Sequence, residues 1–161
     1  MKYNVALLIL TCVSLVSFAG EEIKGTITSV IDGNTIEILT REHETYKILL
    51  HGIDSPDPGQ NYAEQAKKFL EKLLLNKSVT IAIHGKDRQG NRLGEIHVEG
   101  TPDPRQELLK AGLAWTTESV ADFETLKEHA REQGKGLWQD ENPTPPWIYR
   151  RQQSMAQSKT S

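Results

Sequence analysis

The stretch Tyr46-Lys-Ile-Leu-Leu-His-Gly-Ile-Asp-Ser-Pro-Asp57 governs the interpretation of the whole chain. Its first half is an apolar run typical of a buried strand. Its second half is a turn with two carboxylates, Asp54 and Asp57, on either side of Ser55-Pro56. Carboxylates at the end of a buried strand are held rigidly, which suits a hard cation such as calcium. The alternative is that both aspartates only begin a turn and a helix, where Asp is common.

Residues 1–19 have the features of a secretory signal peptide. Lys2 precedes an apolar run over 5–16, and Ser17-Phe18-Ala19 ends in the small residue that a signal peptidase requires. We therefore expect an exported protein, periplasmic or secreted. The run is too short for a membrane anchor, so no stable membrane insertion is expected. Cys12 is the only cysteine, so the mature chain would have no disulfide and no thiolate metal site.

The charge of the chain argues against a general attraction to nucleic acid. The net charge is −3, and loss of Lys2 with the signal peptide makes it about −4. Binding to phosphates is driven by Lys and Arg, so a nucleic-acid partner would need a local basic patch.

Alternating apolar residues and turn signals predict a mainly β domain over 22–150. The predicted strands are short, and helices are inserted between and after them, which favours an α+β fold built on a five-stranded barrel of the oligonucleotide/oligosaccharide-binding (OB) type with about three helices. Residues 151–161 are nearly devoid of apolar side chains and are predicted to form a disordered tail. The expected strands cover 23–30, 35–39, 46–50, 78–83 and 93–98, and the expected helices cover 62–75, 106–113 and 123–133.

Five short motifs occur in the order and spacing of one known family. The chain resembles staphylococcal-nuclease-like proteins, the thermonuclease family, from about residue 23 to residue 150. Each motif is weak alone, and the five in order are specific. They are Ile31-Asp32-Gly33-Asn34-Thr35, Gly52-Ile53-Asp54-Ser55-Pro56, Gly112-Leu113-Ala114-Trp115, Gly136-Leu137-Trp138 and Pro145-Pro146-Trp147.

The resemblance implies calcium-dependent hydrolysis of phosphodiester bonds in DNA or RNA. In that family carboxylates hold the metal, a glutamate activates water, and two arginines clamp the scissile phosphate. Metal and arginine offset the charge that develops on the phosphoryl oxygens.

The implied metal ligands are present in part. Asp54 matches the family's metal-binding aspartate, and Ser55 replaces a threonine beside it. Asn34 stands where the family has a second aspartate, which removes a full negative charge and should weaken calcium binding. We expect the turns of Asp32 and Asp54 to converge into one acidic pocket.

The implied catalytic residues differ more. Asp57 stands where the family has glutamate, and the missing methylene draws the carboxylate back by about 1 Å, a shift that can cost roughly 100-fold in rate. The first arginine position holds Leu49. Lys47 lies two residues earlier on the same strand face, but an ammonium does not reproduce a bidentate guanidinium.

The second arginine position holds Asn91, with Arg92 one residue late. Strand alternation would direct Arg92 to the opposite face unless the preceding loop absorbs the extra residue. Loss of one transition-state arginine costs about 10³ to 10⁵ in rate in phosphoryl transfer.

Two hypotheses follow. The one that we favour from sequence is an exported nuclease-fold protein whose phosphodiesterase activity is absent or very weak, and which retains a binding or structural role. The alternative is a functional calcium-dependent endonuclease in which Lys47 and Arg92 replace the family arginines. The alternative requires both cations to lie within a few ångströms of Asp54 and Asp57.

Two further groups of residues have an ordinary structural explanation. Trp115, Trp138 and Trp147 are expected to pack, with Trp147 holding the chain end against the domain. Arg150 and Arg151 are expected to form a solvated basic end rather than a nucleic-acid arm.

Overall fold

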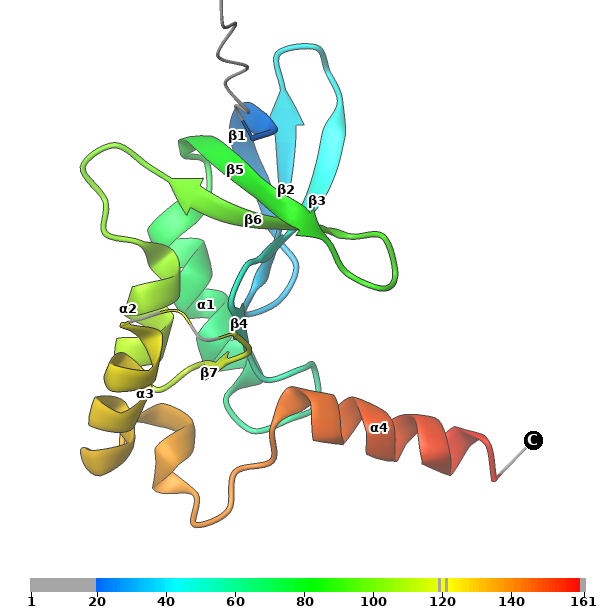
Figure 1. Ribbon diagram of the computed structural model, residues 1–161, viewed down its shortest axis with the longest axis vertical. Helices are drawn as coiled ribbons and strands as arrows, with labels where there is room; N and C mark the ends of the chain where they lie inside the picture. Colours follow the sequence, from blue (N-terminus) through cyan, green and yellow to red (C-terminus); the bar gives the residue numbers. More distant parts are fainter. Residues whose placement is uncertain (1–19, 119, 121, 160–161) are drawn as a thin grey trace, which may run out of the picture.

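The computed structural model describes residues 20–118, 120 and 122–159 (Figure 1). The predicted signal peptide lies outside the described residues. Among the residues described, no helix is both long enough and apolar enough to cross a bilayer.

A closed barrel of five strands forms the upper part of the molecule (Figure 1). Neighbouring strands pair in the order β1-β2-β3-β6-β5, and β1 closes the barrel onto β5. All pairs are antiparallel except β3 with β6. The predicted OB-type barrel is therefore confirmed. Its strands are β1 (Glu22–Val30), β2 (Thr35–Thr40), β3 (Thr45–Leu50), β5 (Ser78–Lys86) and β6 (Arg92–His97).

The barrel core is made by the alternate apolar residues of these strands. In β2, for example, Ile36 and Ile38 are fully buried, whereas Leu39, which points to the opposite face, is exposed. Ile48 and Leu50 of β3 face the same core, so the apolar half of the opening stretch is a barrel strand. Burial on this scale is the main favourable term in folding.

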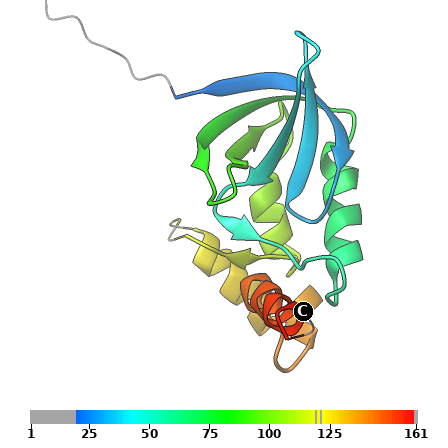
Figure 2. The same cartoon turned by 90° about the vertical axis from the view of Figure 1, so that its right-hand side faces the viewer.

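Helices cover the lower end of the barrel. The three predicted helices are observed close to their expected bounds, and an additional helix, α4, projects from the body beyond them (Figure 1) and is seen end-on in Figure 2. A two-stranded sheet of β4 (Ile53–Asp54) and β7 (Trp115–Thr116) lies between the barrel and α4 in both views. The helices are α1 (Ala63–Leu74), α2 (Pro104–Lys110), α3 (Phe123–Glu132), the short 3-10 helix η1 (Gly136–Gln139) and α4 (Pro146–Gln157).

The structure corrects the expected disordered tail. Residues 151–157 continue α4, which begins with Pro146 in its first turn. Proline is favoured there because its missing N–H has no partner in a first turn anyway. The following residues 150–157 contain no glycine, proline or β-branched side chain, so nothing local stops the helix.

Candidate active site

Asp54 is fixed by the small sheet below the barrel. The chain leaves β3, turns at Gly52 with a φ of 83°, and pairs Asp54 with Trp115 through β4 and β7. A positive φ of this size favours glycine, which explains the residue at the turn. Asp54 is only 9% exposed, so its carboxylate sits on a rigid and largely buried backbone.

The turn of Asp32 and the turn of Asp54 are hydrogen bonded to each other. The Ser55 hydroxyl donates to the Gly33 carbonyl at 3.1 Å, and the Ser55 N–H donates to Oδ1 of Asn34 at 3.3 Å. A side chain at Gly33 would collide with the Cβ atoms of Ser55 and Ala66, each 2.6 Å away. The close approach therefore requires glycine at position 33.

These contacts also engage the side chains expected to bind metal. Oδ1 of Asn34 already accepts the Ser55 N–H, and Oδ1 of Asp32 accepts the Asn34 N–H at 3.0 Å. The hydroxyl of Ser55 donates to a backbone carbonyl. Asn34 and Ser55 thus hold the two turns together, and Asp32 stabilises the turn that carries Asn34.

Burial raises the pKa of both carboxylates in the turn after β4. Desolvation is the main cause for Asp54 and for Asp57, and the negative charge of Asp32 adds to it in each case. The contacts with Arg150 act in the opposite direction but do not cancel the effect. Burial therefore disfavours the ionised form of both carboxylates even beside the guanidinium.

The cation in contact with this pocket is Arg150 of α4. Its Nη2 lies 2.6 Å from Oδ2 of Asp54, and its Nη1 lies 3.0 Å from Oδ2 of Asp57. Sequence analysis placed Arg150 in a solvated end, and the structure corrects that expectation. The available signal was Pro145-Pro146, which marks a helix start and places residue 150 one turn after Trp147.

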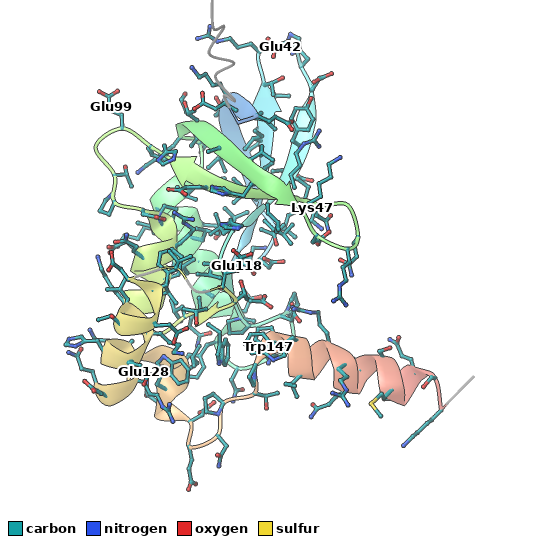
Figure 3. The ribbon with its side chains drawn as sticks, in the orientation of Figure 1. Glu42, Lys47, Glu99, Glu118, Glu128 and Trp147 are labelled. Atoms are coloured by element: carbon teal, nitrogen blue, oxygen red, sulfur yellow. The ribbon has the colours of Figure 1, made fainter. Side chains whose placement is uncertain are left out.

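The residues proposed to replace the family arginines make other contacts. Arg92 stacks on the Tyr46 ring, with Cζ 4.4 Å from the ring centroid, and its Nε lies 3.7 Å from Glu21. Lys47 is exposed on the barrel. Trp147, which marks the base of α4, lies below the barrel (Figure 3). Within the described ranges, neither Lys47 nor Arg92 forms an ion pair with Asp54 or Asp57.

The two positions that lack arginine have structural roles. Leu49 pairs with Leu93 in the parallel ladder between β3 and β6. Asn91 donates through Nδ2 to the Asp87 carboxylate at 2.8 Å and closes the β5–β6 loop. Neither side chain can bind a phosphate through charge.

The donor chemistry of the pocket fits a hard cation that takes few ligands from the protein. Over the described part of the chain, no group of three or more His, Cys, Asp or Glu side chains is gathered to hold a metal ion. Asp54 and Asp57 nevertheless present carboxylate oxygens, the donors that calcium prefers. Asp54 would hold the ion beside Asp57, with water or substrate oxygens completing its coordination.

Comparison with known proteins finds a match to one family. The sequence pattern described as "Staphylococcal nuclease homologue" matches residues 47–140. That range includes Asp54 and Asp57 and ends before α4, so Arg150 comes from an element outside the matched stretch.

Several curated proteins are similar over most of this chain. A protein of Escherichia coli O157:H7 named "Uncharacterized endonuclease" is 33% identical over 132 residues, covering 80% of this chain and 86% of the relative. A Haemophilus influenzae protein of the same name is 32% identical over 80% of this chain and 74% of its own length. "Probable staphylococcal-like nuclease CAN1" of Oryza sativa is 31% identical over 71% of this chain and 34% of its own.

Proposed function

The chain belongs to the staphylococcal nuclease homologue family, and from this membership we propose that it is an endonuclease that hydrolyses phosphodiester bonds in DNA or RNA. The signal-peptide features of residues 1–19 are the reason to propose that it is exported. One observation carries the proposal. Two carboxylates at the family's site, Asp54 and Asp57, are held within reach of a single guanidinium at the end of a rigid buried strand. The relatives named endonucleases support the same activity.

The pocket assigns separate tasks to its two carboxylates. Asp54 is the more buried and orients the charged groups around it. Asp57 accepts a proton from the attacking water, whose oxygen forms a bond to phosphorus while the bond to the leaving sugar oxygen breaks. The leaving oxygen takes a proton from solvent. Because burial raises the pKa of Asp57, its carboxylate is a stronger base than an exposed aspartate.

Calcium is the cofactor that we propose, held by Asp54 beside Asp57. When bound, it would supply positive charge to offset the charge that develops on the phosphoryl oxygens. Because Asn34 replaces an aspartate and is engaged with Ser55, affinity for the ion should be lower than that of a three-carboxylate site.

The proposal is tested by cleavage of heat-denatured DNA by the purified chain in millimolar calcium and in chelator. Asp57→Asn should reduce the rate by about 10² to 10⁴, the usual contribution of a general base. Asp122→Asn is the matched control, because Asp122 is exposed and its side chain makes no capping hydrogen bond. No cleavage by the unmodified chain, or equal cleavage by Asp57→Asn, would refute the proposal.

A second function, nucleic-acid binding with little hydrolysis, is favoured by the absence of arginine at positions 49 and 91. The decisive variant combines Leu49→Arg, Asp57→Glu, Asn91→Arg and Asn34→Asp. A silent native chain beside an active combined variant would support the binding function. A native chain that cuts only with calcium would support the nuclease.

A further inference from the structure

The first turn of α4 is fixed against the active-site turn. The Trp147 ring meets Trp115 of β7 edge-on, with ring centroids 6.5 Å apart. Gln60 links the two segments, since its Oε1 accepts the Asp57 N–H at 2.9 Å and its Nε2 donates to the Thr144 carbonyl at 2.8 Å. Arg150 follows one helical turn later, so its position is set by packing on both sides.

The guanidinium of Arg150 retains capacity for a further anion. It uses Nη1 and Nη2 to contact Asp54 and Asp57, and among the described residues its Nε–H has no hydrogen-bond acceptor. Its side chain is 50% exposed, although the two carboxylates that it contacts are 12% and 24% exposed. A guanidinium has five N–H donors in a planar fork, a geometry that matches phosphate oxygens.

A phosphate that enters this pocket needs such a cation. The hydrogen bonds between the two turns bring Asp32 near Asp54, and Asp54 and Asp57 share one guanidinium, so three carboxylates gather there. They would repel a phosphodiester anion. A guanidinium is charged at any ordinary pH, so Arg150 supplies a permanent positive charge to the pocket.

We propose that Arg150 binds a phosphate of the nucleic acid directly, so that α4 rather than the barrel supplies the phosphate-binding arginine. The inference rests on the proposed function. It assigns a substrate contact to a residue outside the range that matches the family, and to a side chain that also bridges both carboxylates.

The test is binding of a short fluorescent single-stranded oligodeoxythymidylate in chelator, where no metal-dependent cleavage occurs. Anisotropy titrations over a range of salt concentrations compare the unmodified chain with Arg150→Gln. We expect binding to weaken by about tenfold, since a charge-assisted hydrogen bond is lost. The slope of log affinity against log salt should fall in size by about 0.7, as for one phosphate contact on a single strand.

Arg151→Gln is the matched control. Arg151 is exposed on the same helix and makes no ion pair within the described part of the chain. It should bind the oligonucleotide with unchanged affinity and slope. Arg150→Lys should recover part of the affinity and the full slope, because the charge is restored without the fork. Thermal unfolding of each variant verifies that the fold is intact.

Three results would overturn the inference. They are equal binding by Arg150→Gln, tighter binding by Arg150→Gln, and no measurable binding by the unmodified chain at low salt. Tighter binding would show that the guanidinium occludes the pocket. Cleavage in calcium is measured separately, so a chain that fails to cut but loses affinity on Arg150→Gln would refute the proposed function and support the phosphate contact.

Discussion

Arg150 and Asp54 are separated by 96 residues in the chain, yet the guanidinium Nη2 lies 2.6 Å from the Asp54 carboxylate. The contact joins the C-terminal helix to the strand end on which the site is built. Asp57 shares the same guanidinium. The position of α4 is therefore part of the site, and changes that loosen α4 should alter the site without touching either carboxylate.

Trp147→Ala should release α4 from the body. Trp147 is 41% exposed and packs edge-on against Trp115, a type of contact that contributes about 1 kcal/mol. We expect amide hydrogen exchange in α4 to become roughly tenfold faster, while the barrel strands keep their protection. Met155→Ala on the same helix is the control, because Met155 is 53% exposed. Unchanged exchange in Trp147→Ala would mean that other contacts hold the helix.

The sequence predicts the barrel well because its strands alternate in a local pattern. Ile36 and Ile38, for example, face the core with the polar Glu37 between them, and the turn before β2 carries both glycine and asparagine. Asp54 and Asp57 follow directly after that pattern in the sequence, which is why they are candidates for the site. These features depend on residues that lie close together in the chain.

The partners of the charged residues around the site depend on contacts between segments that are distant in the chain. Arg150 looks like a charge in a polar tail, and nothing local indicates that its partners are Asp54 and Asp57. Arg92 could be assigned a strand face from its spacing, but its contacts with Tyr46 and Glu21 follow from how the barrel closes. Pairing across about a hundred residues is not encoded in periodicity.

Gly112→Ala should destabilise the junction of α2 and η1 severely. Gly112 has a φ of 69°, and an added Cβ would lie 2.2 Å from the Lys135 carbonyl oxygen. Gly134→Ala is the matched control, since its φ is 57° but nothing lies within 4 Å of the added atom. The control should lose about 1–2 kcal/mol, the cost of the left-handed conformation. Urea unfolding should give a clearly larger loss for Gly112→Ala, and equal losses would contradict the close contact.

Stability should fall as the pH drops below about 6.5, in part because of His51. Burial lowers the pKa of His51 below its usual 6.5, and the nearby His84 and Arg105 lower it further, while Glu118 and Glu95 oppose them. The unfolded chain then binds more protons than the folded chain. The stabilising contribution is complete above pH 6.5 and is lost as the pH falls through the folded value.

Unfolding free energies at several pH values between 5 and 8 test this expectation. The pH dependence should become shallower in His51→Gln, which cannot be protonated. His129→Gln, a change at an exposed position on α3, should leave the slope as it is. An unchanged slope in His51→Gln would assign the acid sensitivity to other groups.

Asp54→Asn should stabilise the protein while removing its activity. Burial keeps the pKa of Asp54 above its ordinary value even beside Arg150, so the charged carboxylate is less favourable in the fold than in water. A neutral side chain of the same shape removes that cost, so the free energy of unfolding should rise by on the order of 1 kcal/mol. Denaturant unfolding in chelator measures the gain without interference from a bound ion.

Asp32→Asn is the control for Asp54→Asn, because an asparagine at position 32 keeps the oxygen that accepts the Asn34 N–H. It should change the unfolding free energy little. A loss of stability in Asp54→Asn would show that the pair with Arg150 outweighs the desolvation of the carboxylate. A gain combined with lost cleavage would instead show that Asp54 is kept charged for function at the expense of stability, as expected of a buried residue that must face a cation.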